Sequence, residues 1–197
     1  MRNMDISNGE GIGAALFVQG CNHRCKGCFN SDTWDFSGGN EWTQEVKDEF
    51  LKLIDKPHIK RVSILGGCPL ADENVEDVFE LIKDIKRLYP TKKIWLYTGY
   101  TWEETMSYES ELKHAKDTLE QNSNQRYYRI YKDSMFTYKP DSYTLRKEII
   151  SLCDILVDGR YIDELRDLTL KFRGSSNQRL IDVKKSLEQN EVVLWSK

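Results

Sequence analysis

The sequence lacks the features that would mark a membrane or secreted protein. No stretch reaches the roughly 18 consecutive apolar residues that a transmembrane helix needs. Residues 1–13 contain no apolar core of the kind found in a signal peptide. These two absences predict a cytoplasmic protein that does not associate with a membrane.

The chain also lacks a strong excess of charge of either sign. It has 29 Lys and Arg against 32 Asp and Glu in 197 residues, a formal net charge of −3. This balance argues against a protein that binds nucleic acids or membrane surfaces in general. It does not exclude a local charged patch. The five cysteines are an odd number, so without a secretion signal we expect no disulfide framework.

Apolar runs that end at glycines alternate with amphipathic segments. Strands are predicted at 14–19, 61–65, 93–98, 153–157 and 191–195, and helices at 43–55, 73–88 and 102–121. This alternation is typical of βαβ units, so we expect an α/β fold with a parallel sheet. We expect one domain over residues 1–197. An insertion is predicted near 107–148, where periodicity is weak, with a possible docking surface in its Tyr-rich part, 127–143.

Three cysteines, Cys21, Cys25 and Cys28, stand in the spacing C-x3-C-x2-C with no fourth cysteine nearby. A [4Fe–4S] cluster needs four ligands, usually four cysteines, so three would leave one iron open to a small molecule. The alternative is zinc, with His23 as a fourth ligand, in a non-catalytic interaction module. Structural zinc sites usually have two CxxC-like halves, and this chain has only one.

Several polar or Gly-rich strings follow the predicted strands: the cysteine loop, GGCPL at 66–70, TGY at 98–100 and DGR at 158–160. Sites in parallel α/β sheets gather at the carboxyl ends of the strands. The four strings are therefore expected to meet at one edge of the sheet.

These strings carry a resemblance to a known family. The chain resembles the radical S-adenosylmethionine superfamily and, within it, the glycyl-radical-enzyme activases of anaerobic ribonucleoside-triphosphate reductase. The matching strings are FVQGCNHRCKGCFN at 17–30, LGGCPL at 65–70, WLYTGY at 95–100, DILVDGRY at 154–161 and FRGSSNQRLIDV at 172–183. Many superfamily members have an aromatic residue just before the last cysteine. Here that residue is Gly27 and the aromatic follows as Phe29, as in the activases.

The resemblance implies an incomplete (β/α) barrel or curved parallel sheet of the radical S-adenosylmethionine type. It implies a [4Fe–4S] cluster and S-adenosylmethionine as cofactors, with the reduced cluster cleaving the sulfonium to a 5′-deoxyadenosyl radical. That radical would take a hydrogen atom from a glycine of the reductase, the protein substrate. A low-potential donor such as flavodoxin or ferredoxin would supply the electron. A related enzyme acting on a small molecule, similar to a deazapurine synthase, is the alternative.

The resemblance also implies roles for single residues near the cysteines. Cys21, Cys25 and Cys28 would ligate the cluster. Gly27, Phe29 and Asn30 would lie beside the adenine of the cosubstrate.

The remaining implied residues lie at other strand ends. Gly66 and Gly67 would receive the methionine amino group, and Thr98 and Asp158 would line the cosubstrate cavity. Arg173 and Arg179 are candidates to bind a carboxylate or the glycine loop of the partner.

Cys68 departs from the family pattern, because relatives have an acid at this position. A thiol is a weak partner for an ammonium group, since charge-assisted hydrogen bonds are about twice as strong as neutral ones. Three explanations are open. The backbone carbonyls alone bind the methionine amino group, the carboxylate of Asp72 or Glu73 binds it in place of the missing acid, or the chain binds the cosubstrate more weakly. A fourth cluster ligand at Cys68 is disfavoured, because it would close the open iron.

Overall fold

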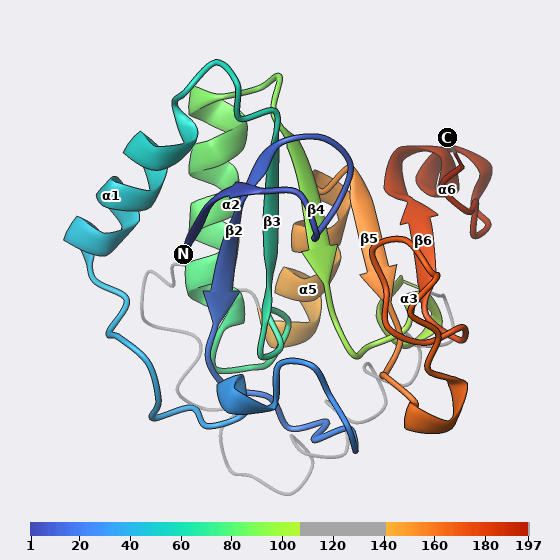
Figure 1. Ribbon diagram of the computed structural model, residues 1–197. Helices are drawn as coiled ribbons and strands as arrows, with labels where there is room; N and C mark the ends of the chain where they lie inside the picture. The colour runs from blue at the N-terminus through green and yellow to red at the C-terminus, as the bar shows by residue number, and fades with distance from the viewer. Residues whose placement is uncertain (107–140, 197) are drawn as a thin grey trace, which may run out of the picture.

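The computed structural model describes residues 1–106 and 141–196, and these form one six-stranded sheet with helices packed against it (Figure 1). The four central strands are parallel and each edge strand is antiparallel to its neighbour. The strands lie side by side in sequence order: β1 (Arg2–Asp5), β2 (Gly13–Val18), β3 (Arg61–Gly66), β4 (Lys93–Tyr97), β5 (Ile155–Asp158) and β6 (Arg179–Asp182).

The helices are α1 (Gln44–Ile54), α2 (Val75–Leu88), α3 (Trp102–Met106), α5 (Ser142–Leu152) and α6 (Val183–Gln189). Two short 3-10 turns lie at Ser31–Thr33 and Asp163–Leu165. Three of the helices have an N-cap side chain whose oxygen accepts a hydrogen bond from a backbone N–H of the first turn. The caps are Thr43 for α1, Asp141 for α5 and Asp182 for α6.

The main core lies between the sheet and the helices α1, α2 and α5, which lie on the same side of it (Figure 1). Alternate strand residues point into it, because successive side chains on a strand face opposite sides. Its fully buried members include Ile64, Leu96 and Leu156 from the strands and Ile82 and Ile149 from the helices.

The opposite face of the sheet carries a smaller apolar cluster: Trp95, Ile155, Val157 and Leu180, with Tyr97, Phe172 and Trp195 packed against it. Beside this cluster Arg61 is almost completely buried. It donates to the Asp5 carboxylate and to the backbone carbonyls of Asp5, Asn8, Glu10 and Gly11. This buried ion pair fixes the loop between β1 and β2 onto the sheet.

The predictions of the central strands and of the helices at 43–55 and 73–88 are confirmed. The fourth of these strands begins at Ile155, two residues later than predicted, and buried Cys153 caps α5 instead. The predicted terminal strand at 191–195 is wrong, because there Leu194 makes only an isolated bridge to Ile181. The last strand is β6, which lies within the string FRGSSNQRLIDV and for which no strand is predicted from the sequence.

The expected parallel sheet is found in the four central strands, while the edge strands β1 and β6, which the sequence does not predict, are antiparallel to their neighbours. Residues 142–148 of the expected insertion belong to α5, which buries Leu145, Ile149 and Ile150 in the main core. The predicted helix at 102–121 begins as α3. Its part beyond residue 106, the rest of the insertion and most of the Tyr-rich stretch lie outside the described residues.

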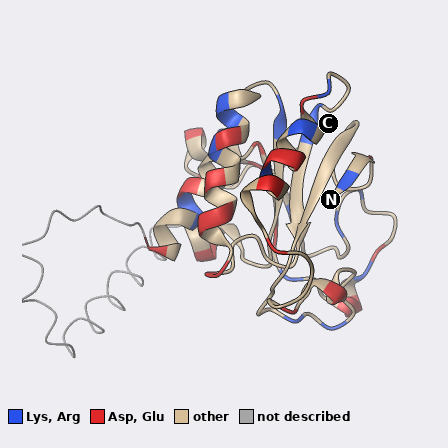
Figure 2. Cartoon of the chain, turned by 90° about the vertical axis from the view of Figure 1, so that its left-hand side faces the viewer, with Lys and Arg blue, Asp and Glu red and all other residues tan. Residues whose placement is uncertain are grey.

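Charged residues of both signs lie along the helices, while the strands carry few of them (Figure 2). Among the described residues, no helix combines the length and the apolar character that crossing a membrane requires.

Candidate functional site

The carboxyl ends of the central parallel strands point to one edge of the sheet (Figure 1). The cysteine loop follows β2, the Gly66–Gly67 turn ends β3, the residues 98–100 follow β4, and Gly159 and Arg160 follow β5. The convergence predicted from the sequence is therefore confirmed for these four segments.

The cysteine loop is held at its base and in its middle by backbone hydrogen bonds. The N–H of Gly20 donates to the Thr33 carbonyl over 2.9 Å, and that of Cys21 donates to the Trp34 carbonyl over 3.1 Å. The N–H of Cys28 donates to the Cys25 carbonyl over 3.1 Å, which closes a tight turn between these two cysteines. All three thiols of the motif are half-buried.

The three thiols are close enough to influence one another. Burial raises the pKa of the Cys25 thiol, the neighbouring thiols of Cys28 and Cys21 act in the same direction, and a hydrogen bond with the Tyr161 backbone acts against them. In the described part of the chain, no three Cys, His, Asp or Glu side chains are grouped to hold a single metal ion. An iron–sulfur cube spreads its ligands over separate iron atoms, so three half-buried thiols on one loop fit the cluster better than a single ion.

The glycine turn after β3 packs directly on the backbone of the cysteine loop. The N–H of Gly67 donates to the Val18 carbonyl over 2.8 Å, and the N–H of Cys68 donates to the Gly20 carbonyl over 2.7 Å. A Cβ atom at Gly67 would lie 2.4 Å from the Gly20 carbonyl oxygen. Only glycine allows this close approach, so Gly67 fixes the distance between the turn and the first cysteine.

The Cys68 side chain points into the protein. It is 1% exposed, belongs to the main core, and lies 3.4 Å from the Thr98 hydroxyl. Burial raises the pKa of the Cys68 thiol. The carboxylate of Asp72 instead pairs with Arg146 of α5, whose Nε donates to the Leu70 carbonyl over 2.7 Å.

His23 is directed toward the loops after β4 and β5. Its ring meets that of Tyr100 edge to face at 4.8 Å, and its Nδ1 accepts a hydrogen bond from Arg160 Nε over 3.2 Å. A Cβ atom at Gly99 would lie 2.3 Å from the ring. In this arrangement Nδ1 of His23 is bonded to Arg160 and is not free to act as a fourth zinc ligand.

The residues around the last cysteine contact the loop after β5. Phe29 is 57% exposed, packs on Tyr161 at 5.2 Å and lies under the guanidinium of Arg166 at 5.3 Å. Gly27 has a positive φ of 73°, and a Cβ atom there would lie 2.6 Å from Asp163.

Asn30 acts through its backbone. Its carbonyl accepts from the N–H and the hydroxyl of Thr33, over 2.9 Å and 2.7 Å. These bonds fix the turn that follows the cysteines.

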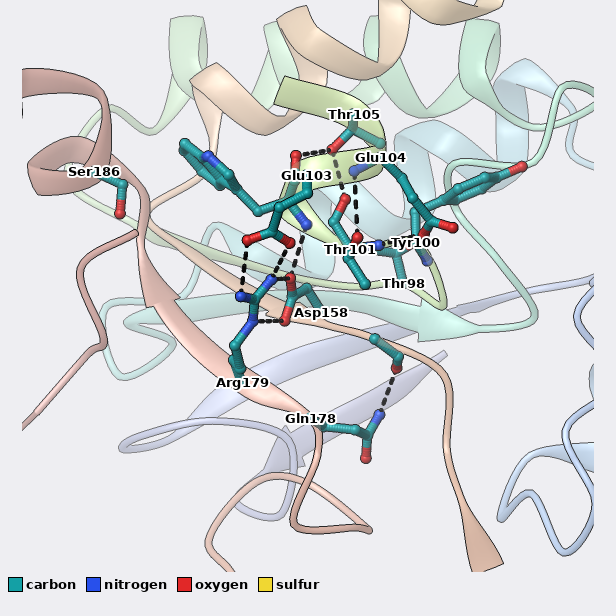
Figure 3. A network of polar contacts seen from close by, with 12 residues as sticks. Thr98, Tyr100, Thr101, Glu103, Glu104, Thr105, Asp158, Gln178, Arg179 and Ser186 are labelled. Carbon is teal, nitrogen blue, oxygen red and sulfur yellow. Dashed lines mark hydrogen bonds and ion pairs between the residues drawn. The ribbon is translucent and has the colours of Figure 1, made fainter. Parts of the chain in front are cut away.

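Asp158 is completely buried and its carboxylate is fully engaged (Figure 3). It accepts from both Nε and Nη2 of Arg179 and from the backbone N–H of Trp102 at the start of α3. Arg179 also makes a two-pronged ion pair with Glu103, over 2.9 and 2.7 Å. The hydrogen bonds that Arg179 donates to Asp158, and then those to Glu103, raise the pKa of Arg179. The structure thus assigns the Asp158 carboxylate to holding β5, β6 and α3 together.

The two arginines that the sequence offered as partner-binding groups are turned inward. Arg179 is bound as described, and Arg173 donates through Nη1 to the Gln178 carbonyl over 3.0 Å. The Gln178 side chain ties the same loop to the end of β5, because its Nε2 donates to the Gly159 carbonyl over 3.1 Å (Figure 3).

Sequence reasoning missed Arg146, whose guanidinium lies 4.7 Å from the centre of the Tyr100 ring. The available signal was the spacing of Leu145 and Ile149, four residues apart, which indicates a helix at this point of the chain.

Comparison with known proteins identifies the family. The model of a 4Fe–4S single cluster domain matches residues 7–123 and 120–181. A protein of Vibrio cholerae named anaerobic ribonucleoside-triphosphate reductase-activating protein is 34% identical over 177 residues, covering 89% of this chain and 90% of its own. The chain belongs to this family of activating proteins.

Relatives of the same name occur in Escherichia coli K12 and in enterobacteria phage T4. The first is 31% identical over 89% of this chain and 91% of its own, and the second is 30% identical over 89% and 87%. No solved structure gives a significant match to the chain. The family assignment supports the iron–sulfur interpretation of the three cysteines.

Proposed function

We propose that this protein is an activating enzyme that generates a glycyl radical on anaerobic ribonucleoside-triphosphate reductase. The cofactors are a [4Fe–4S] cluster and S-adenosylmethionine, and a flavodoxin or ferredoxin supplies the electron. When bound, the cluster supports reductive cleavage of the cosubstrate to methionine and a 5′-deoxyadenosyl radical, which takes a hydrogen atom from the glycine. The names of the relatives favour this protein substrate over a small molecule.

The chain itself would hold the cluster through Cys21, Cys25 and Cys28. The observation that carries the proposal is the packing of the half-buried cysteine loop on the Gly66–Gly67 turn, through the short bond from the Cys68 N–H to the Gly20 carbonyl. With this contact, backbone groups of the described residues, rather than a side-chain acid at position 68, would lie beside the open iron.

Of the three explanations for the missing acid, we therefore adopt the one in which backbone carbonyls bind the methionine amino group. Carbonyls of the glycine turn would receive it, while Cys68 fills the core behind the turn and bonds Thr98. Asp158 would shape the cosubstrate cavity indirectly, through α3 and Arg179.

On the other side of the cosubstrate, the exposed ring of Phe29 and the backbone between Gly27 and Asn30 are available to contact the adenine. The four parallel strands would form the wall of an incomplete barrel of the radical S-adenosylmethionine type, within one domain spanning residues 1–197.

The test is anaerobic incubation of the reconstituted protein with dithionite and S-adenosylmethionine, followed by chromatography for 5′-deoxyadenosine. Wild-type protein should form it, and Cys25→Ala should form none and bind little iron. Cys153→Ala is the matched control, because this buried thiol lies in the core away from the loop, and it should keep both iron and product.

Adding the anaerobic reductase should then produce a glycyl signal in the electron paramagnetic resonance spectrum. A wild-type protein that binds four iron atoms but forms neither product nor signal would refute the proposed function.

A further inference from the structure

Arg160, which lies just after the end of β5, contacts the cysteine loop from outside it. Its Nε donates to Nδ1 of His23 over 3.2 Å, and His23 stands between Cys21 and Cys25 in the sequence. The guanidinium of Arg160 is therefore a positive charge that a hydrogen bond attaches to the loop with the cluster ligands.

Backbone hydrogen bonds on both sides of Arg160 fix the segment that presents it. The N–H of Gly159 donates to the Tyr100 carbonyl over 3.0 Å. The carbonyl of Arg160 itself accepts from Nδ2 of Asn177 over 2.8 Å. The backbone of Arg160 is thus anchored to the loop after β4 and to the segment before β6, and its side chain reaches the cysteine loop from a fixed position.

This segment acts on the thiol of Cys25. Burial is the largest influence and raises the pKa of the Cys25 thiol, whereas a hydrogen bond with the Tyr161 backbone and the charge of Arg160 lower it. Residues 160 and 161 therefore both favour negative charge on this sulfur, and the thiolate is the form that binds a metal. Charge and hydrogen bonds near the ligand sulfurs also help to set the reduction potential of an iron–sulfur cluster.

The charge of Arg160 is opposed by one carboxylate among the described residues. Nη2 of Arg160 pairs with Glu104 of α3 over 3.4 Å, and the two side chains are 56% and 42% exposed. Water screens an ion pair that is this exposed, so its energy is small. The positive charge that acts on the cysteine loop is accordingly modest, and it depends on the balance between Arg160 and Glu104.

We propose that Arg160 is a positioning residue that holds a positive charge at the cysteine loop through His23 and so raises the reduction potential of the cluster. Glu104 opposes this effect by compensating the charge. Reduction adds one negative charge to the cluster, and a positive charge fixed beside its ligands stabilises the reduced form. The inference rests on the proposed function for the presence of the cluster.

The test is a redox titration of the anaerobically reconstituted protein without S-adenosylmethionine, followed by electron paramagnetic resonance of the reduced cluster. Arg160→Gln removes the charge but keeps an N–H group that can donate to His23. This change should disfavour the reduced form about three- to tenfold, which lowers the potential by about 30–60 mV for one electron, with unchanged iron content. Arg160→Lys keeps the charge and should retain the wild-type potential.

Glu104→Gln should change the potential in the opposite direction. Its amide oxygen can still accept from the Thr101 N–H, which the carboxylate binds over 2.8 Å, but the variant no longer compensates Arg160. The potential should therefore rise above that of wild type. Loss of packing alone would not move the potentials of these two variants in opposite directions. Arg87→Gln, at a 67% exposed side chain on α2, is the matched control and should leave the potential unchanged.

An unchanged potential in Arg160→Gln, or a potential in Glu104→Gln that does not rise, would overturn the inference. An Arg160→Lys potential as low as that of Arg160→Gln would also overturn it, because these two variants differ in charge. If Arg160→Gln assembled no cluster, the direction of the change in Glu104→Gln would decide. Wild-type protein that binds four irons but forms no 5′-deoxyadenosine would instead refute the proposed function, and the potentials could still be compared.

Discussion

Replacing Arg179 by methionine should strongly destabilise the protein, because it leaves a buried charge without its partner. Asp158 is 0% exposed, and in the variant its carboxylate would keep, of the bonds it makes with described residues, only the one from the Trp102 N–H. Breaking a buried ion pair by removing one partner costs about 3–5 kcal/mol. The Arg179 side chain is 30% exposed, so water reaches part of the site, and we expect the lower end, about 3 kcal/mol.

The assay is urea unfolding under anaerobic conditions, followed by circular dichroism. Adding Asp158→Asn to Arg179→Met should recover about 1–2 kcal/mol, because the second change removes the stranded charge. Lys83→Met is the control, since its pair with Glu80 is exposed and should contribute no more than about 1 kcal/mol. A loss below about 1 kcal/mol in Arg179→Met, or no recovery in the double variant, would refute the reasoning.

Three further predictions concern groups near the site and on the opposite face of the sheet. The Tyr97 hydroxyl is buried without a partner among the described residues, and burial raises its pKa. Folded protein therefore holds this proton more tightly than unfolded protein, so the free energy of unfolding of wild type should fall above about pH 10. Urea unfolding at about pH 8 and about pH 10.5 should show a smaller fall for Tyr97→Phe than for wild type. Cys68→Glu should lower the unfolding free energy by about 3 kcal/mol without tightening S-adenosylmethionine binding, because the side chain enters the core; tighter binding measured by calorimetry would contradict this. Gly67→Ala should reduce the iron content of reconstituted protein, because its Cβ would push the turn away from Gly20, and full iron content would show that the contact is dispensable.

The central strands could be predicted from the sequence because each is a short apolar run buried on both faces. The edge strands could not. Residues Arg2–Asp5 form a polar segment, largely exposed, that pairs on one side only, and β6 has four residues that follow a polar loop directly. The string at 191–195 has a strand-like composition but packs its Trp195 on the opposite face of the sheet, so local pattern alone was misleading there.

The cysteine loop was predictable because its three cysteines lie within eight consecutive residues. The surroundings of the loop were not, because their partners lie far away in the sequence. Arg160 donates a hydrogen bond to His23, which lies 137 positions earlier in the sequence. Arg146 donates to the carbonyl of Leu70, which lies 76 positions earlier. Burial of Cys68 likewise depends on how α2 and β4 pack around the glycine turn, which no local pattern specifies.

The most direct measurement of the central claim is Mössbauer spectroscopy of the anaerobically reconstituted protein, with and without S-adenosylmethionine. Three thiolate ligands predict a four-iron cluster in which one iron differs from the other three, and addition of S-adenosylmethionine should change the signal of that iron alone. Four irons with protein ligands throughout that do not respond to S-adenosylmethionine, or protein that binds no iron, would contradict the account.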